Sequence, residues 1–173
     1  MISIANLRNL LLTPLDNSNV LLPTLARVVF LLVFFFYFLN SAGTKIDGSI
    51  FSPSAGAFAQ IFPKAAEAAL YDITQLSLIQ RLVIFAGTVG EYVLPVLIVI
   101  GLVTRLAALG MIGFVLVQTL VDVTGHGAKL GSWLNNAPEL IDQRTLWVFL
   151  LCVLVVKGAG PLSVDRLWAA RET

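Results

Sequence analysis

The chain has few of the residues on which catalytic chemistry in proteins usually depends. Its 173 residues include one cysteine, Cys152, and one histidine, His126. A single cysteine excludes an intramolecular disulfide and a thiol-pair redox motif within this chain, and its apolar neighbours predict a buried, inert side chain. A lone histidine in a glycine-rich segment is more typical of an exposed loop than of a metal ligand. Because the sequence also lacks a Ser-His-Asp arrangement and a glycine-rich phosphate loop, we expect no metal site and no hydrolytic or nucleotide chemistry.

Charged residues are scarce as well. They make up 12% of the sequence, hydrophobic residues make up 58%, and the formal net charge is +1. A soluble domain usually has about 25% charged residues. The small net charge and the absence of a basic run argue against a nucleic-acid partner. With a mean hydropathy of +0.91, the chain is predicted to have the lipid bilayer as its solvent.

Long apolar runs dominate the sequence instead. A membrane-spanning helix needs about 20 mainly apolar residues, and three runs approach or reach that length. A fourth run reaches it only if its helix starts at Pro138, since proline is favoured in the first turn of a helix. The sequence shows no internal repeat or linker. We therefore predict an all-α membrane protein, one domain over residues 1–173, that forms a bundle of four transmembrane helices at about 23–42, 82–103, 106–121 and 138–157.

The basic residues suggest an orientation for this bundle. Four spans place both termini on the same side of the membrane. The turn between the second and third spans carries Arg105, and the tail carries Arg166 and Arg171. Basic residues are enriched in cytoplasmic segments, so we predict that both termini are cytoplasmic.

One ionisable residue lies inside an apolar run. Glu91 is in the second predicted span, and Pro95 follows four residues later. Proline has no N–H group, so in a helix it leaves the carbonyl of Glu91 without its usual donor. A carboxylate and a free carbonyl are both costly in hydrocarbon, which makes Glu91 a candidate functional residue. A structural ion pair, or hydrogen bonds that join helices, explains the residue equally well.

Other polar residues fall at similar depths. At a rise of 1.5 Å per residue, Glu91, Tyr37, Gln118 and Arg144 lie roughly 18 to 21 Å from the cytoplasmic ends of their spans. We expect that these four side chains can meet at one depth in the bundle. Arg27 lies lower, so its side chain has to be fully extended to approach Glu91. Glycines let membrane helices approach closely, and the sequence favours this packing role over a ligand groove. They are Gly87 and Gly90 on the second span and Gly110 and Gly113 on the third.

Several features follow one another in a recognisable order. Arg27 opens the first span, a glycine and Lys45 close it, Glu91 lies in the second span, and the last span ends in the sequence GAGPLSVD. In order and spacing these features resemble the DoxX family of small bacterial membrane proteins, whose ending is Gly-x-Gly-x-x-Ser-x-Asp. The resemblance covers about residues 27–167. The chain departs from the family in its long first loop and in NSAGTKIDG, which lacks the histidine or glutamine often found before that lysine.

The resemblance implies a four-helix bundle in the bacterial cytoplasmic (inner) membrane, associated with quinone-linked thiosulfate oxidation or with antioxidant assemblies. No haem ligand pair or cluster ligand set is present, so the chain is expected to bind no cofactor alone and to contact at most a quinone. The first hypothesis is an accessory or quinone-contacting subunit with a protein partner in a membrane redox complex. The alternatives are a carrier or export partner for a small solute, metal or peptide, and a structural membrane anchor. Glu91 is the expected catalytic, proton-accepting group, and the polar cluster comprises Arg27, Tyr37, Gln118, Arg144 and Arg105.

Overall fold

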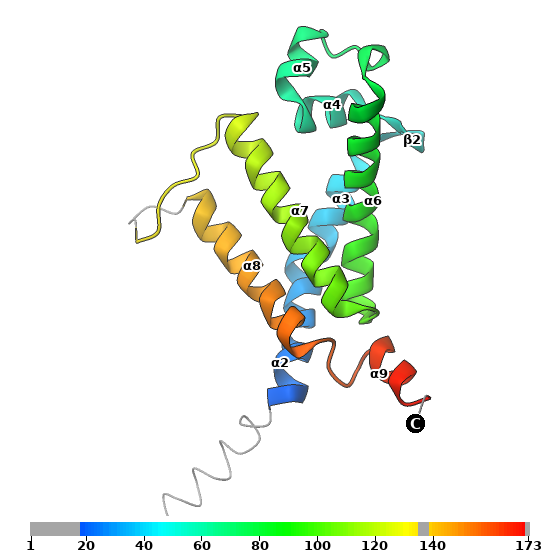
Figure 1. Cartoon of the computed structure of the whole chain (residues 1–173), viewed down its shortest axis with the longest axis vertical. Helices are drawn as coiled ribbons and strands as arrows, with labels where there is room; N and C mark the ends of the chain where they lie inside the picture. Colours follow the sequence, from blue (N-terminus) through cyan, green and yellow to red (C-terminus); the bar gives the residue numbers. More distant parts are fainter. Residues whose placement is uncertain (1–17, 135–138, 172–173) are drawn as a thin grey trace, which may run out of the picture.

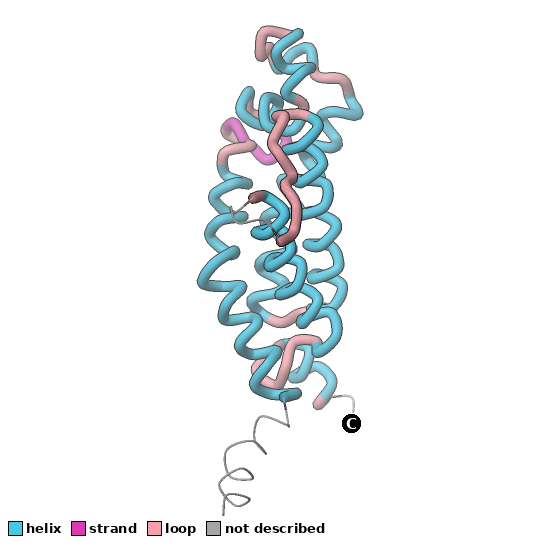
Figure 2. Tube along the Cα trace, turned by 90° about the vertical axis from the view of Figure 1, so that its left-hand side faces the viewer, coloured by secondary structure: helices cyan, strands magenta, loops and turns pink. Residues whose placement is uncertain are grey.

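Helices make up most of the structure, a computed structural model that describes residues 18–134 and 139–171. Three helical segments are long and apolar enough to cross a membrane, namely Asn19–Gly43, Leu78–Ile100 and Thr104–Thr124. They run side by side along the long axis of the molecule together with a fourth helix (Figures 1 and 2). The elements are α2 (Ser18–Phe30), η1 (Leu31–Phe35), α3 (Phe36–Gly43), β1 (Ile46–Asp47), β2 (Ser49–Pro53), α4 (Ala55–Ile61), α5 (Pro63–Ala68), η2 (Ile73–Gln75), α6 (Leu78–Ile100), α7 (Thr104–Thr124), α8 (Leu140–Lys157) and α9 (Val164–Ala169).

The first three predicted spans coincide with these three segments, which confirms a helical protein with several apolar helices. The fourth predicted span corresponds to α8, which has 18 residues and is not among the candidate membrane spans. It carries Asp142, Arg144 and Lys157, so it is less apolar than the other three. Its predicted start at Pro138 lies outside the described residues. α8 packs against α7 and α2.

A row of aromatic side chains holds the helices together. Phe30, Phe34 and Phe38 recur every four residues, which places them on one face of the first helical segment. All three are buried, and the ring of Phe34 packs edge-on against Trp147 of α8, with 5.0 Å between ring centroids. η1 is a π-helical turn within this segment, so α2 and α3 meet through a locally wider turn.

A small cap lies at the upper end of the molecule (Figure 1). The two-stranded antiparallel hairpin of β1 and β2 and the short helices α4 and α5 pack around the first turns of α6. Phe58 and Ile84 are buried in the small core between the cap and α6. The first turn of α6 is fixed by a capping box, in which the side chains of Ser77 and Gln80 each accept a hydrogen bond from the other residue's backbone N–H.

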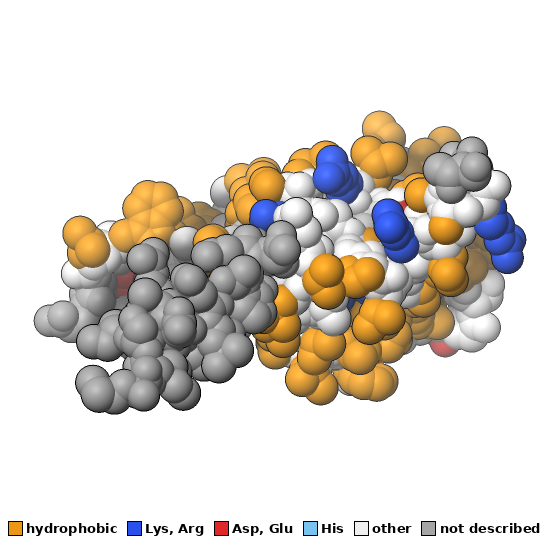
Figure 3. Space-filling model, turned by 90° about the horizontal axis from the view of Figure 1, so that it is seen from below, with side chains coloured by type: hydrophobic (Ala, Val, Ile, Leu, Met, Phe, Trp, Pro, Cys, Tyr) orange, Lys and Arg blue, Asp and Glu red, His pale blue; other side chains and the backbone are white. Residues whose placement is uncertain are grey.

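The lower end is closed by a tight turn between α6 and α7. Gly101 has a φ of +73°, a left-handed conformation that glycine adopts without strain. The carboxylate of Asp165 accepts hydrogen bonds from the backbone N–H groups of Val103 and Thr104, at 2.6 and 3.0 Å, and so caps the start of α7. Figure 3 views this end, where lysine and arginine side chains lie among apolar ones.

Candidate functional site

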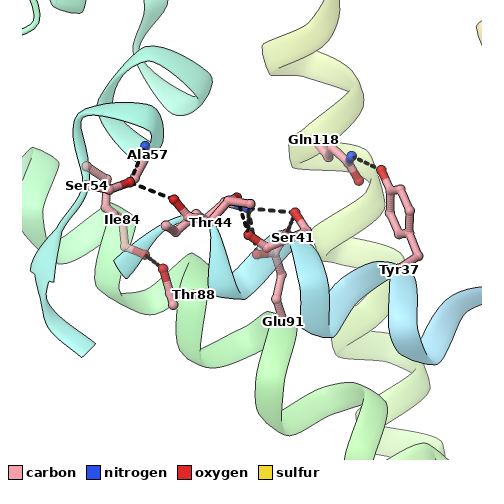
Figure 4. Close-up of polar contacts among 10 residues, drawn as sticks. Tyr37, Ser41, Thr44, Ser54, Ala57, Ile84, Thr88, Glu91 and Gln118 are labelled. Carbon is pink, nitrogen blue, oxygen red and sulfur yellow. Dashed lines mark hydrogen bonds and ion pairs between the residues drawn. The ribbon is translucent and has the colours of Figure 1, made fainter. Parts of the chain in front are cut away.

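Glu91 forms a buried ion pair with Lys45. The Lys45 Nζ atom lies 2.7 Å from Glu91 Oε2, and the two residues are only 4% and 2% exposed. Ser41 joins the pair because its hydroxyl donates to Glu91 Oε1 at 3.0 Å and accepts from Lys45 Nζ at 2.8 Å. Figure 4 shows Ser41 on α3 and Glu91 on α6 pointing toward each other. The buried carboxylate is therefore neutralised by a residue that lies just beyond the end of the first helical segment.

Local structure explains how Lys45 reaches back into the bundle. α3 ends at Gly43, and the backbone N–H of Lys45 donates to the carbonyl of Ala42 at 3.0 Å. Ser54, which caps α4, holds this corner from the other side. Its hydroxyl donates to the Thr44 carbonyl at 2.7 Å, and its backbone N–H donates to the Lys45 carbonyl at 3.0 Å. The cap thus fixes the backbone from which the lysine side chain folds back along α3.

A second polar network joins α3, α7 and α8. Gln118 Nε2 donates to the Tyr37 hydroxyl at 3.2 Å, and Gln118 Oε1 accepts from Arg144 at 3.2 Å (Figure 4 shows the Gln118–Tyr37 contact). Arg144 also binds Asp122, with 2.7 Å between Nη2 and Oδ2, and its guanidinium lies 4.4 Å from the ring centroid of Trp147. Arg144 Nε is buried and has no hydrogen-bond partner among the described residues. Three of the predicted polar residues, Tyr37, Gln118 and Arg144, are therefore in one network.

A cleft of about 370 Å³ between α6 and α7 connects these two networks. Lys45 and Glu91 lie on its wall together with Gln118 and Asp122, while most of its lining is apolar. Its volume falls within the range of about 300 to 1,000 Å³ that is usual for small-molecule pockets. A largely apolar cleft with a few convergent polar groups is the arrangement expected of a ligand site.

The glycines of α6 and α7 contribute to this cleft as well as to helix packing. Gly87, Gly90, Gly110 and Gly113 all line it. A Cβ atom on Gly110 would lie 3.1 Å from the Leu94 side chain, so this glycine permits close packing as the sequence suggested. A Cβ atom on Gly87 or Gly113 would have no neighbour within 4 Å. These two positions leave space in the cleft, a role that the sequence analysis ranked second.

Arg27 lies at the opposite end of the bundle, which corrects the expectation that it could reach Glu91. Its guanidinium donates to the carbonyls of Ile98 and Ala159, each at 3.0 Å, and to those of Val99 and Leu162. Because these carbonyls belong to the end of α6 and to the segment after α8, Arg27 links both of them to its own helix, α2, at the lower end. Arg105 is at this end too, where it donates to the Val156 carbonyl at 3.3 Å, so neither arginine belongs to the polar cluster around Glu91.

His126 and Cys152, for which no chemical role was expected, both lie at the surface of the structure. His126 is exposed, as expected of a loop histidine, and its Nε2 atom lies 2.8 Å from the Gln60 carbonyl of the cap. Cys152 is exposed on the outer face of α8, so the prediction of a buried thiol is wrong. An apolar neighbourhood in sequence does not reveal which face of a membrane helix points inward. Within the described residues, no group of three or more His, Cys, Asp or Glu side chains could hold a metal.

A role at the site for Lys45, Ser41 or Asp122 was not predicted from the sequence. A signal for Lys45 was present, since a carboxylate in an apolar span needs a nearby cation and Lys45 is the first one after the first span. Nothing in the local pattern indicated Ser41, because serine is common where membrane helices pack.

The pair can bind a ligand or move a proton, since a carboxylate next to an ammonium can accept a hydrogen bond or a proton from a molecule in the cleft. Comparison with known proteins adds no assignment. No protein-family model, curated protein or solved structure matches the chain.

Proposed function

We propose that this chain is an integral membrane protein of the DoxX type that binds a membrane-soluble ligand between α6 and α7. In this proposal it serves a membrane redox system as an accessory, quinone-contacting subunit. The observation that carries the proposal is the cleft of about 370 Å³. Its wall is mostly apolar but also includes the buried Lys45–Glu91 pair. A quinone has an apolar tail and a polar ring, and the same combination lines the cleft. Electron transfer would depend on a partner protein, since the sequence supplies no redox group of its own.

The energetics of the pair also support a functional role. A buried ion pair is weak evidence for stability, because removing two charges from water costs about as much as their attraction returns. An apolar pair of similar size would hold α3 and α6 together at least as well. Retaining charges on the wall of a cleft is therefore better explained by a ligand than by helix packing.

The proposal includes a topology. We propose that α8 crosses the membrane as a fourth span, because its 18 residues extend about 27 Å at 1.5 Å per residue and it packs along α7. The charged groups of Arg144 and Asp122 pair with each other, which lowers the cost of placing them near the lipid. With this topology, both termini are cytoplasmic and the cap of α4 and α5 lies outside. The membrane that the helices cross is the inner membrane of a bacterium.

A photoreactive short-chain quinone tests the ligand proposal. The protein is reconstituted into nanodiscs, irradiated with the probe and digested, and the labelled peptides are mapped. We expect labelling in α6 and α7. Gly113→Leu fills the cleft from a position where a Cβ atom meets nothing within 4 Å, so it should reduce labelling at least about tenfold without strain.

A matched control places similar bulk outside the cleft. Leu116 is 60% exposed on α7, so Leu116→Phe enlarges a side chain on the outer face and should leave labelling unchanged. Equal labelling of the Gly113→Leu protein and the unaltered protein would contradict the proposal.

The carrier alternative rests on the extent of the same cleft. Its lining runs from the deep Lys45–Glu91 pair to Gln60 in the cap and Asp122 near the upper end of α7, so a solute could move between these depths. Uptake of a labelled solute by proteoliposomes would favour this alternative. A structural anchor would show neither uptake nor quinone labelling.

A further inference from the structure

The hydrogen-bonding capacity of Lys45 is fully used. A lysine ammonium has three protons to donate and accepts no hydrogen bond. The structure provides three acceptors for Lys45 Nζ, which are Glu91 Oε2 at 2.7 Å, the Ser41 hydroxyl at 2.8 Å and the Ser41 carbonyl at 3.3 Å. The ammonium therefore has no proton left for a molecule in the cleft.

Glu91 is in the opposite situation. An ionised carboxylate offers about four acceptor positions. Among the described residues, only Lys45 and Ser41 donate to it, one to each oxygen. Glu91 lines the cleft, most of whose wall is apolar, and the residue is only 2% exposed, so water satisfies little of its remaining acceptor capacity. An unused acceptor in such surroundings favours the binding of a donor.

We propose that the cleft selects ligands whose polar end carries a hydroxyl group, and that this hydroxyl donates a hydrogen bond to Glu91. Ligands that offer only a carbonyl or an ether oxygen at this end find no free donor on Lys45. A cationic donor is disfavoured because the Lys45 ammonium lies 2.7 Å from the same carboxylate. The inference rests on the proposed function and narrows it, because it assigns this end of the cleft to the hydroxyl-bearing quinol form rather than to the quinone.

The walls of the cleft can accommodate an aromatic ring that carries this hydroxyl group. Gly87 on α6 and Gly113 on α7 leave open space, and Phe114 also lines the cleft, with its ring 3.8 Å from where a Cβ atom on Gly90 would lie. Aromatic rings pack favourably against one another in offset or edge-on arrangements. A phenol with an alkyl tail is therefore the simplest molecule with the required features.

A matched pair of probes tests this selectivity. Binding of radiolabelled 4-nonylphenol and of its methyl ether, 4-nonylanisole, is measured on the full chain in nanodiscs, with empty nanodiscs subtracted. The two probes share ring and tail and differ in the hydroxyl proton. We expect the phenol to bind at least about tenfold more tightly, because a hydrogen bond to a charged group contributes about that factor or more.

Two variants locate the effect. In Glu91→Gln, one carboxylate oxygen becomes an NH2 group that donates instead of accepting, and the remaining amide oxygen is neutral and faces one of the two existing donors, so the ratio of the two affinities should fall to about one. In Ser41→Ala, Lys45 loses an acceptor and gains a free proton, so the methyl ether should bind more tightly and the ratio of the two affinities should fall. Ser41→Ala removes only a hydroxyl, so it keeps the test decisive if Glu91→Gln does not fold.

The outcomes separate this inference from the proposed function. If both probes bind equally and Gly113→Leu blocks both, the hydroxyl selectivity is wrong and the ligand cleft stands. An unchanged affinity ratio in Ser41→Ala would also overturn the selectivity. If neither probe binds above the level of empty nanodiscs, the ligand cleft itself is contradicted.

Discussion

Arg27 and Lys45 both carry a positive charge into the bundle, and their surroundings differ in kind. Among the described residues, the Arg27 guanidinium donates only to backbone carbonyls, those of Ile98, Val99, Ala159 and Leu162. Lys45 binds a carboxylate and a serine, and its pair with Glu91 forms part of the cleft wall. The Arg27 charge therefore binds together segments at the lower end of the molecule, whereas the Lys45 charge lies beside a cleft that can receive a ligand.

The difference shows that a charge inside a membrane protein is not by itself evidence of a functional site. At the lower end, the carbonyls at the end of α6 and in the segment after α8 need donors, and Arg27 supplies them. Asp165 does the same for the N–H groups at the start of α7. These ionic groups satisfy the backbone. At the cleft, Glu91 keeps acceptor capacity that no described residue uses, and this remainder is what makes it a candidate site.

Lys45→Met should have the largest effect on stability, because it leaves the buried Glu91 carboxylate without its counter-ion. We expect a loss of about 3 to 5 kcal/mol in the free energy of unfolding. The double variant Lys45→Met/Glu91→Leu removes both charges and should recover most of that loss while losing the binding of 4-nonylphenol. Unfolding of the purified protein in mild detergent measures the first effect. A double variant as unstable as the single one would mean that the pair serves the fold.

Arg27→Met should destabilise the protein by about 2 to 3 kcal/mol, since it leaves several carbonyls of the lower end without a donor. Arg27→Lys keeps the charge but not the planar fork, so its loss should be intermediate. The affinity for 4-nonylphenol should not change in either variant at a temperature where it is folded. A loss of affinity that exceeds the loss of folded protein would show that the two regions are coupled.

Cysteine labelling tests whether the two regions face opposite sides of the membrane. In a Cys152→Ala background, a cysteine that replaces His126 near the cap should react with an impermeant maleimide from outside. A cysteine that replaces Arg171 near the lower end should react only after the membrane is opened. The reverse pattern would invert the proposed orientation, and labelling of both from one side would contradict four crossings.

Cys152→Ala should have the smallest effect, below about 0.5 kcal/mol, because the thiol is exposed on the outer face of α8 and creates no cavity when it is removed. Thermal unfolding in detergent checks this value. A marked loss of stability would indicate that the outer face of α8 is covered in the assembled protein.

The helical class and the positions of three apolar spans could be predicted from the sequence, because both depend on hydropathy over neighbouring residues. The need of Glu91 for a partner inside the bundle was also predictable, since a carboxylate in an apolar run is costly wherever the helix packs. Tyr37, Gln118 and Arg144 were correctly grouped with one another by depth, and the structure joins them through hydrogen bonds.

The identity of the partner of Glu91 was not predictable in the same way. Depth estimates treat each span as an ideal straight helix, whereas the π-helical turn Leu31–Phe35 alters the direction in which later side chains point. Lys45 lies beyond the helix and reaches back because Ser54 holds its backbone. The sequence indicated that Glu91 needs a cation, but the choice among cations depends on contacts between residues distant in the sequence.

The sequence by itself determined that this protein has apolar helices suited to a membrane and a carboxylate that must be neutralised there. Both follow from transfer free energies, which depend on residue type and length of run. Only the tertiary structure decided that Lys45 neutralises Glu91, that Arg27 closes the lower end, and that Cys152 faces outward. These depend on the rotation and packing of helices, where small differences in direction determine which side chains meet.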